Sequence, residues 1–87
     1  MQSVFAKNNK EIFKVKFNTM ENVKNFVALT ESLSSDILVY SSHYMVDGRS
    51  IMGILSLALD YPVDVRVIDE KEREYLKGKL KELGIVV

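Results

Sequence analysis

The chain of 87 residues contains no cysteine, no tryptophan, one proline and one histidine. Without cysteine, neither a disulfide framework nor a thiolate metal site can form. The single histidine, His43, has no second imidazole with which to share a metal ion. The 12 basic residues balance 12 acidic ones, so no net field draws the chain onto nucleic acid. These absences count against a disulfide scaffold, a metal centre and a nucleic-acid-binding protein.

Long apolar runs are also missing. The longest, residues 51–59, is interrupted by Gly53 and Ser56 and is far shorter than the roughly 18–20 residues that span a bilayer. A signal peptide has an apolar stretch followed by small residues. Residues 1–10 do not contain this pattern. We therefore expect a cytoplasmic protein with no membrane partner. A length of 87 residues predicts one domain spanning residues 1–87.

The first part of the chain carries a strand pattern followed by a helix pattern. Apolar and charged residues alternate over residues 11–17, which is the period of a half-buried strand. Asn18 is predicted to be the N-cap of the helix, with Glu21 completing a capping box. The apolar stripe of this helix consists of Met20, Val23, Phe26, Val27, Thr30 and Leu33. Residues 1–10 are either a frayed extension or an earlier start of the strand.

The middle of the chain predicts a β-hairpin and a short helix. Residues 37–40 and 44–46 are rich in β-branched and aromatic side chains and are separated by a short polar loop. Residues 47–49 form a predicted turn, after which Ser50 is placed to cap a helix that continues to about Leu59.

The last third predicts one more strand and one more helix. Valine alternates with charged residues over residues 63–67. Asp69 is predicted to cap the final helix, with Glu72 completing a second capping box, and Gly84 is placed to end it. The resulting order, βαββαβα, predicts an α+β fold with a four-stranded antiparallel sheet and its helices on one face.

One short run of residues resembles a known family. Arg49-Ser50-Ile51-Met52-Gly53 is similar to the Lys/Arg-Ser-Ile-Met-Gly run that opens the second helix of HPr, the phosphocarrier family of the phosphotransferase system. The order and lengths of the predicted elements also match that family over most of residues 11–84. The resemblance implies the HPr-like open-faced β-sandwich, with three helices on one face of the sheet.

The same resemblance implies that the phosphotransfer site is lost. HPr proteins open their first helix with a Gly-x-His-Ala-Arg-Pro motif, in which the histidine carries the phosphate and the arginine helps to bind it. Counting back without gaps from Ser50 places Thr19 on the histidine and Glu21 on the arginine. A threonine hydroxyl lacks the nucleophilicity of an imidazole, and a carboxylate repels a phosphoryl group. We therefore expect no enzymatic activity, no phosphate transfer through this site and no cofactor.

The resemblance also assigns two recognition features to the second helix. Ser50 matches the serine that a dedicated kinase phosphorylates in HPr proteins of many low-GC Gram-positive bacteria; the alternative is that Ser50 only caps the helix. The residues that match the docking patch of HPr proteins are Arg49, Ile51, Met52 and Leu55. The alternative is that some or all of the apolar ones belong to the core, and we expect Met52 to be the exposed one.

The other candidate ligands have ordinary structural explanations. His43 falls in the predicted hairpin loop, where we expect a solvated side chain rather than a substitute phosphoacceptor. The acidic residues considered for a metal site are Asp60, Asp64, Asp69 and Glu70. They lack the ligand spacing and the glycine of a calcium loop, so no metal site is predicted.

Three functions follow from these observations. The first is a non-catalytic, HPr-related regulatory or interaction protein linked to carbohydrate uptake or catabolite regulation. Its partner would be an HPr-type kinase or a transcriptional regulator, as for the catabolite-repression HPr homologue, which the chain resembles in outline. The second is a phosphocarrier of the sugar phosphotransferase system that uses a non-standard acceptor. The third is an oligomerisation or scaffold domain whose sheet edge pairs with a second copy. We favour the first.

Overall fold

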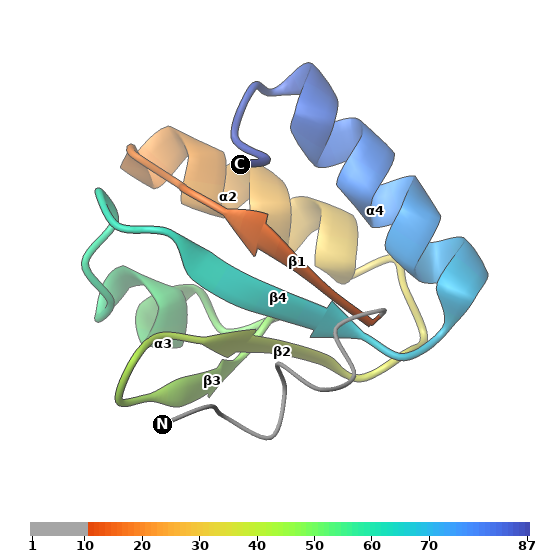
Figure 1. Ribbon diagram of the computed structural model, residues 1–87, viewed down its shortest axis with the longest axis horizontal. Coiled ribbons are helices and arrows are strands. Elements are labelled where there is room, and N and C mark those ends of the chain that lie inside the picture. The colour runs from red at the N-terminus through yellow and green to blue at the C-terminus, as the bar shows by residue number, and fades with distance from the viewer. Residues whose placement is uncertain (1–10) are drawn as a thin grey trace.

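The computed structural model describes residues 11–87, and its elements occur in the predicted order (Figure 1). They are β1 (Ile12–Val15), α2 (Met20–Thr30), β2 (Ile37–Tyr40), β3 (Met45–Asp47), α3 (Ile51–Leu55), β4 (Val63–Val67) and α4 (Glu70–Glu82). The strands form one antiparallel sheet in the order β1-β4-β2-β3, and the helices cover one of its faces. The α+β class and the open-faced arrangement are therefore confirmed. The alternatives for residues 1–10 lie outside the described residues.

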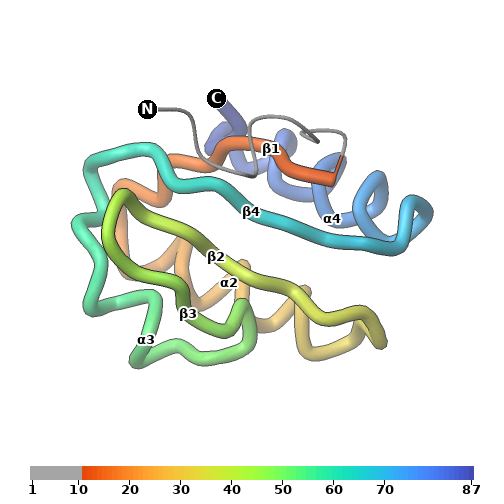
Figure 2. The backbone as a smooth tube through the Cα atoms, turned by 60° about the horizontal axis from the view of Figure 1, so that its bottom comes forward, coloured from red at the N-terminus to blue at the C-terminus, as the bar shows by residue number. Residues whose placement is uncertain are grey.

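The hydrophobic core lies between the sheet and the helices, which form two layers in Figure 2. Alternation in the central strand β4 buries Val63, Val65 and Val67 against the helices. Phe17 and Phe26 meet edge to face with their ring centroids 5.1 Å apart, so the end of the β1 segment packs on α2. The remaining buried apolar residues are Phe13, Val15, Val23, Val27, Ile37, Val39, Ile54, Leu57, Leu76, Leu80 and Ile85.

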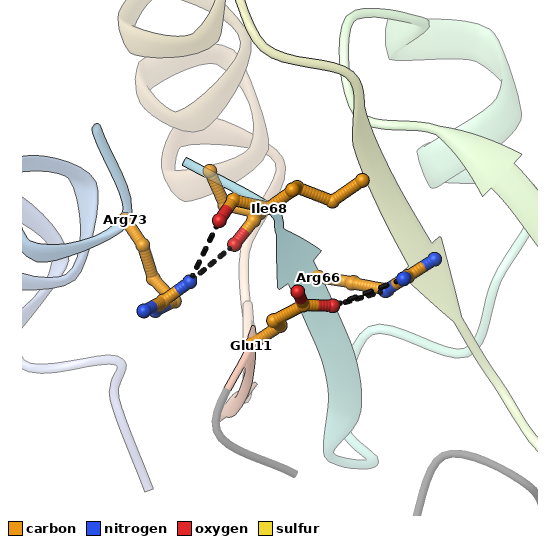
Figure 3. Close-up of polar contacts among 5 residues, drawn as sticks. Glu11, Arg66, Ile68 and Arg73 are labelled. Carbon is orange, nitrogen blue, oxygen red and sulfur yellow. Dashed lines mark hydrogen bonds and ion pairs between the residues drawn. The ribbon is translucent and has the colours of Figure 1, made fainter. Parts of the chain in front are cut away.

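On the face of the sheet opposite the described helices, polar side chains pair with one another. Lys14 of β1 donates over 2.7 Å to Asp64, which lies directly opposite it in β4. Arg66 donates to the Glu11 carboxylate over 2.9 Å (Figure 3). Its hydrogen bonds to Glu11 and to Tyr40 raise the pKa of the Arg66 guanidinium, because both favour the charged form. Ion pairs that are this accessible to solvent add little to the stability of the fold.

The first turn of α4 confirms one prediction and corrects another. Asp69 is the N-cap, and its carboxylate accepts a hydrogen bond from the backbone N–H of Glu72 over 2.9 Å. The second hydrogen bond of the predicted capping box, from the Asp69 N–H to the Glu72 side chain, is wrong. The Glu72 carboxylate bonds instead to the loop that follows α2. Arg73 instead ties this turn to the sheet by donating to the Val67 and Ile68 carbonyls (Figure 3).

The start of α2 differs from the prediction by one residue. Thr19, not Asn18, is the N-cap, and its hydroxyl accepts a hydrogen bond from the backbone N–H of Asn22 over 3.1 Å. Asn18 has φ +67°, a left-handed conformation that asparagine tolerates better than most residues. Its backbone N–H donates to the Leu59 carbonyl over 2.8 Å. The predicted capping box between Asn18 and Glu21 is therefore wrong, because Asn18 precedes the N-cap and its N–H bonds to residue 59.

The helix that follows Ser50 is shorter than predicted. It ends at Leu55 rather than near Leu59. Ser56 stops it, since its hydroxyl donates to the Gly53 carbonyl over 2.6 Å, and such local bonds compete with helix continuation. Even the longest described helix, α4, has only 13 residues, and no helix within residues 11–87 combines the length and apolarity needed to cross a membrane.

The C-terminal residues pair with the outer edge of the sheet, a contact that the sequence did not predict. Gly84 ends α4 with φ +76°, as predicted, and the N–H of Ile85 donates back to the Leu80 carbonyl. The chain then turns along β1, where Val86 forms an antiparallel bridge with Val15. The outer edge of β1 is thus paired within the chain at residues 14–16.

The turn into α3 is packed tightly against the end of α2. The fully buried Thr30 hydroxyl lies 2.9 Å from the Gly48 carbonyl oxygen, and the Gly48 N–H donates to the Ile37 carbonyl over 2.7 Å. A Cβ atom on Gly48 would lie 2.9 Å from that Ile37 oxygen and would also overlap the Ile37 side chain. Only glycine fits between these backbones.

We expect Gly48→Ala to lower the free energy of unfolding by about 1–3 kcal/mol, because the added methyl group forces the turn away from Ile37. Urea denaturation monitored by circular dichroism measures this change. Gly78→Ala is the matched control, because a Cβ there meets nothing within 4 Å and the residue lies inside α4. That variant should gain about 0.5–1 kcal/mol through helix propensity. Equal effects of the two substitutions would contradict the packing argument.

Candidate functional site

Ser50 begins α3 as its N-cap. Its backbone is extended, and its side-chain oxygen accepts a hydrogen bond from the Gly53 N–H over 3.0 Å. Its own N–H donates to the Asp47 carbonyl over 3.0 Å. The side chain is half-buried at the surface. The hydroxyl therefore caps the helix, and its position at the helix end also places it close to solvent.

The apolar residues of α3 divide between core and surface. Ile54 is fully buried, and Ile51 and Leu55 are half-buried and packed against the core. Met52 is 76% exposed, so the expectation that it is the exposed residue of this group is confirmed. The structure thus reduces the predicted apolar patch to a protruding methionine flanked by partly covered aliphatic side chains.

Arg49 is turned toward the protein rather than toward Ser50. Its Nη2 donates to the Leu33 carbonyl and, over 2.7 Å, to the Ser35 carbonyl. These groups belong to the loop that follows α2, whose last turn contains no basic residue. Part-buried carbonyls of a loop need hydrogen-bond donors from elsewhere in the chain, and Arg49 supplies one to each of these two. No local sequence pattern indicates this role, because the partners lie 14 and 16 residues away.

Glu72 also bonds to this loop. Its carboxylate accepts hydrogen bonds from the Ser34 N–H over 3.0 Å, the Ser34 hydroxyl over 2.8 Å and the Ser35 N–H over 2.8 Å. These bonds lower the pKa of Glu72 to about 2, because they favour the ionised form. Arg49 and Glu72 therefore satisfy the carbonyl and N–H groups of one loop.

The predicted phosphotransfer position lies at the start of α2. Thr19 is exposed, and its hydroxyl caps the helix. Glu21 is exposed in the first turn, where a carboxylate favours the helix dipole but repels an anion. Asn22 donates from its side chain to the Phe17 carbonyl over 2.8 Å. The match of Thr19 and Glu21 to the family histidine and arginine stays a prediction.

His43 lies at the tip of the hairpin between β2 and β3. It is exposed, and its backbone N–H donates to the Ser41 hydroxyl oxygen over 3.4 Å. Its ring meets the Tyr44 ring edge to face with the centroids 6.4 Å apart. Within residues 11–87, no three histidine, aspartate or glutamate side chains come close enough together to hold a metal ion.

Comparison with known proteins establishes the fold. No protein-family model matches the chain, and no curated protein matches its sequence. Among solved structures, the chain is similar to the crystal structure of HPr-C-His from Thermoanaerobacter tengcongensis, with 24% identity and a TM-score of 0.67. The similarity covers 83% of this chain and 88% of that chain. The chain therefore has the HPr-like fold.

We expect Glu72→Gln to lower the free energy of unfolding at neutral pH and to lower it less as the medium is acidified. The folded-state pKa of about 2 lies below the ordinary value of 4.5. The carboxylate therefore stabilises the fold fully above about pH 4.5, and this contribution is lost as the pH falls through about 2. Urea denaturation of both proteins across this range measures the difference.

Glu74→Gln is the control for the Glu72 experiment, because it removes the same charge from an exposed position on the same helix. It should cost little at any pH in the range. A deficit for Glu72→Gln that does not change with pH, or that Glu74→Gln reproduces, would contradict the role of the loop contacts.

Proposed function

We propose that this chain is a non-catalytic, HPr-related regulatory or interaction protein that acts through the surface of α3 around Ser50 and Met52. The proposed partners are an HPr-type protein kinase and a transcriptional regulator in carbohydrate uptake or catabolite control. Partners of that kind place the activity in the cytoplasm. The HPr-like fold supports the link to phosphocarrier proteins, and the resemblance of the run at residues 49–53 supports the choice of surface.

The exposure of Met52 is the observation that carries the proposal. A methionine side chain that is 76% exposed adds little to the core. Methionine is flexible and polarisable, which suits a surface that adapts to a partner. Ile51 and Leu55 flank it and are still partly accessible. Together they form a small apolar surface beside the Ser50 hydroxyl.

A phosphate on Ser50 would meet mixed surroundings. The backbone N–H groups at the start of α3 would favour it, since N–H groups and the positive helix end attract anions. Asp47 would oppose it, because its negatively charged carboxylate lies in the same turn and would repel the phosphate. This carboxylate accepts the Arg49 N–H over 2.8 Å. The Arg49 guanidinium could pair with the phosphate only by leaving the Leu33 and Ser35 carbonyls. We therefore assign recognition of the phosphate to the partner and not to an internal ion pair.

Phosphorylation by an HPr-type kinase with ATP tests the proposal. We expect a mass gain of one phosphate on the wild-type chain and none on Ser50→Ala, with Ser42→Ala, a change in an exposed loop serine, behaving as wild type. Ser50→Ala should also cost about 1 kcal/mol of stability through loss of the cap, so circular dichroism must show that the variant is folded. No modification of the wild type, or equal modification of Ser50→Ala, would overturn the serine role.

Incubation with Enzyme I and labelled phosphoenolpyruvate separates this proposal from a phosphocarrier that uses a non-standard acceptor. We expect no label on the chain. An acid-labile label would indicate a phosphohistidine, and loss of that label in His43→Gln would place it on the single histidine. That outcome would replace the regulatory proposal by the phosphocarrier.

A further inference from the structure

One edge of the sheet is open within residues 11–87. The strand order β1-β4-β2-β3 places β1 and β3 at the two edges. At β1, Val86 bridges to Val15 and the Lys16 N–H donates to the Ile85 carbonyl over 2.8 Å, so that edge is paired. Figure 1 shows β3 as the outermost strand on the opposite side of the sheet. In the described part of the chain, β3 pairs with β2 alone.

The backbone of β3 directs several hydrogen-bonding groups away from β2. Hydrogen bonds to the β2 segment flank β3 at residues 44 and 48. Since the bonds of an antiparallel ladder fall at every second residue, Val46 faces β2, and the backbone N–H and C=O groups of Met45 and Asp47 point outward. The Asp47 carbonyl accepts the Ser50 N–H over 3.0 Å. That leaves three outward groups for a further strand, namely the N–H and C=O of Met45 and the N–H of Asp47.

The side chains at this edge are one apolar and one acidic residue. Val46 packs on the core, so Met45 and Asp47 lie on the opposite face of the sheet. Met45 is 60% exposed and lies directly opposite Tyr40, and the exposed Asp47 lies opposite Leu38. Neither ion pair between the described residues includes Asp47. The edge therefore carries a negative charge that no basic side chain in this part of the chain balances.

We propose that the outer edge of β3 binds an extended segment of another protein, which adds to the sheet as an antiparallel strand. An extended chain offers free N–H and C=O groups at the spacing of the three outward groups, whereas a helix keeps its own backbone groups bonded. Cross-strand pairing then places an apolar residue of the segment opposite Met45 and, two positions before it, a lysine or arginine opposite Asp47. The inference does not depend on the function proposed for Ser50 and Met52.

A second copy of this chain fits the same edge less well. Antiparallel pairing of two β3 strands about Val46 places Met45 of each copy opposite Asp47 of the other, so neither carboxylate gains a cation. Pairing about Asp47 places two carboxylates opposite each other, which is destabilising. Pairing about Met45 leaves Asp47 without an opposite strand residue, because β3 begins at Met45. The charge at the edge therefore favours a segment that supplies its own basic residue.

Titration of the full ¹⁵N-labelled chain with the blocked hexapeptide acetyl-Thr-Lys-Thr-Val-Thr-Thr-amide, followed by NMR, tests this inference. We expect saturable shifts that are largest at the outward amides of Met45 and Asp47 and absent at β1. The matched control peptide contains N-methylvaline, which keeps the side chain and removes the N–H that the Met45 carbonyl would accept. It should bind about fivefold more weakly, as expected for one lost hydrogen bond.

Variants of the chain test the two outward residues separately. Asp47→Asn removes the charge and keeps an oxygen that can accept the Arg49 N–H, and it should weaken binding about threefold. Glu74→Gln, on an exposed position of α4, is the matched control and should bind as wild type. Met45→Pro should abolish binding, because it removes an outward N–H that the sheet does not use, and edge strands accept proline at such positions. Met45→Thr keeps this N–H and should still bind.

Circular dichroism must show that each variant is folded. Equal binding of the N-methylated peptide would overturn the proposal, as would binding that Asp47→Asn and Met45→Pro leave unchanged. Shifts centred away from β3, or no approach to saturation at millimolar peptide, would also overturn it. Sedimentation of the free chain as a dimer that Met45→Pro dissociates would assign the edge to a second copy and equally reject the proposed partner.

Discussion

The position of α3, and with it the candidate recognition surface, depends on the close approach of backbones at Gly48. This residue donates its N–H to Ile37 at the start of β2 and accepts the buried Thr30 hydroxyl from the end of α2. One residue thereby joins a helix end, a strand and the turn that leads to Ser50. Ser50 then begins its helix at a fixed distance from the sheet, because its N–H is already bound to the same turn. The placement of the serine is thus a consequence of core packing.

Two charged residues, Arg49 and Glu72, form hydrogen bonds with the loop that follows α2. Arg49 lies 14 and 16 residues from its partners in this loop, and Glu72 lies 37 and 38 residues from its own. Hydrogen bonds to ionised groups are stronger than neutral ones, so these contacts add to the packing of Leu33 on the core in holding the loop in place.

The sequence was sufficient for features that depend on local periodicity and insufficient for those that depend on distant partners. Alternation and helical spacing predicted the element order, because each element buries one face against a single core. The caps at Ser50, Asp69 and Gly84 were predicted correctly, since their partners lie within a few residues. Asn18 and Thr19 are both good caps, and only the bond from Asn18 to residue 59 decides between them. No local pattern predicts the role of Glu72, because its partners lie 37 and 38 residues away.

Within the run of residues 49–53 that resembles the HPr motif, some residues stabilise the fold and one is exposed at the surface. Arg49 secures the loop after α2, and Ser50 caps α3, so the fold alone accounts for both residue types. Ile51 is partly packed on the core. Met52 has no such internal explanation, because a side chain that is 76% exposed neither fills the core nor caps a helix. Met52 therefore supports a role in recognition more than Ser50 does, since a serine would be needed to cap this helix even in a protein that no kinase phosphorylates.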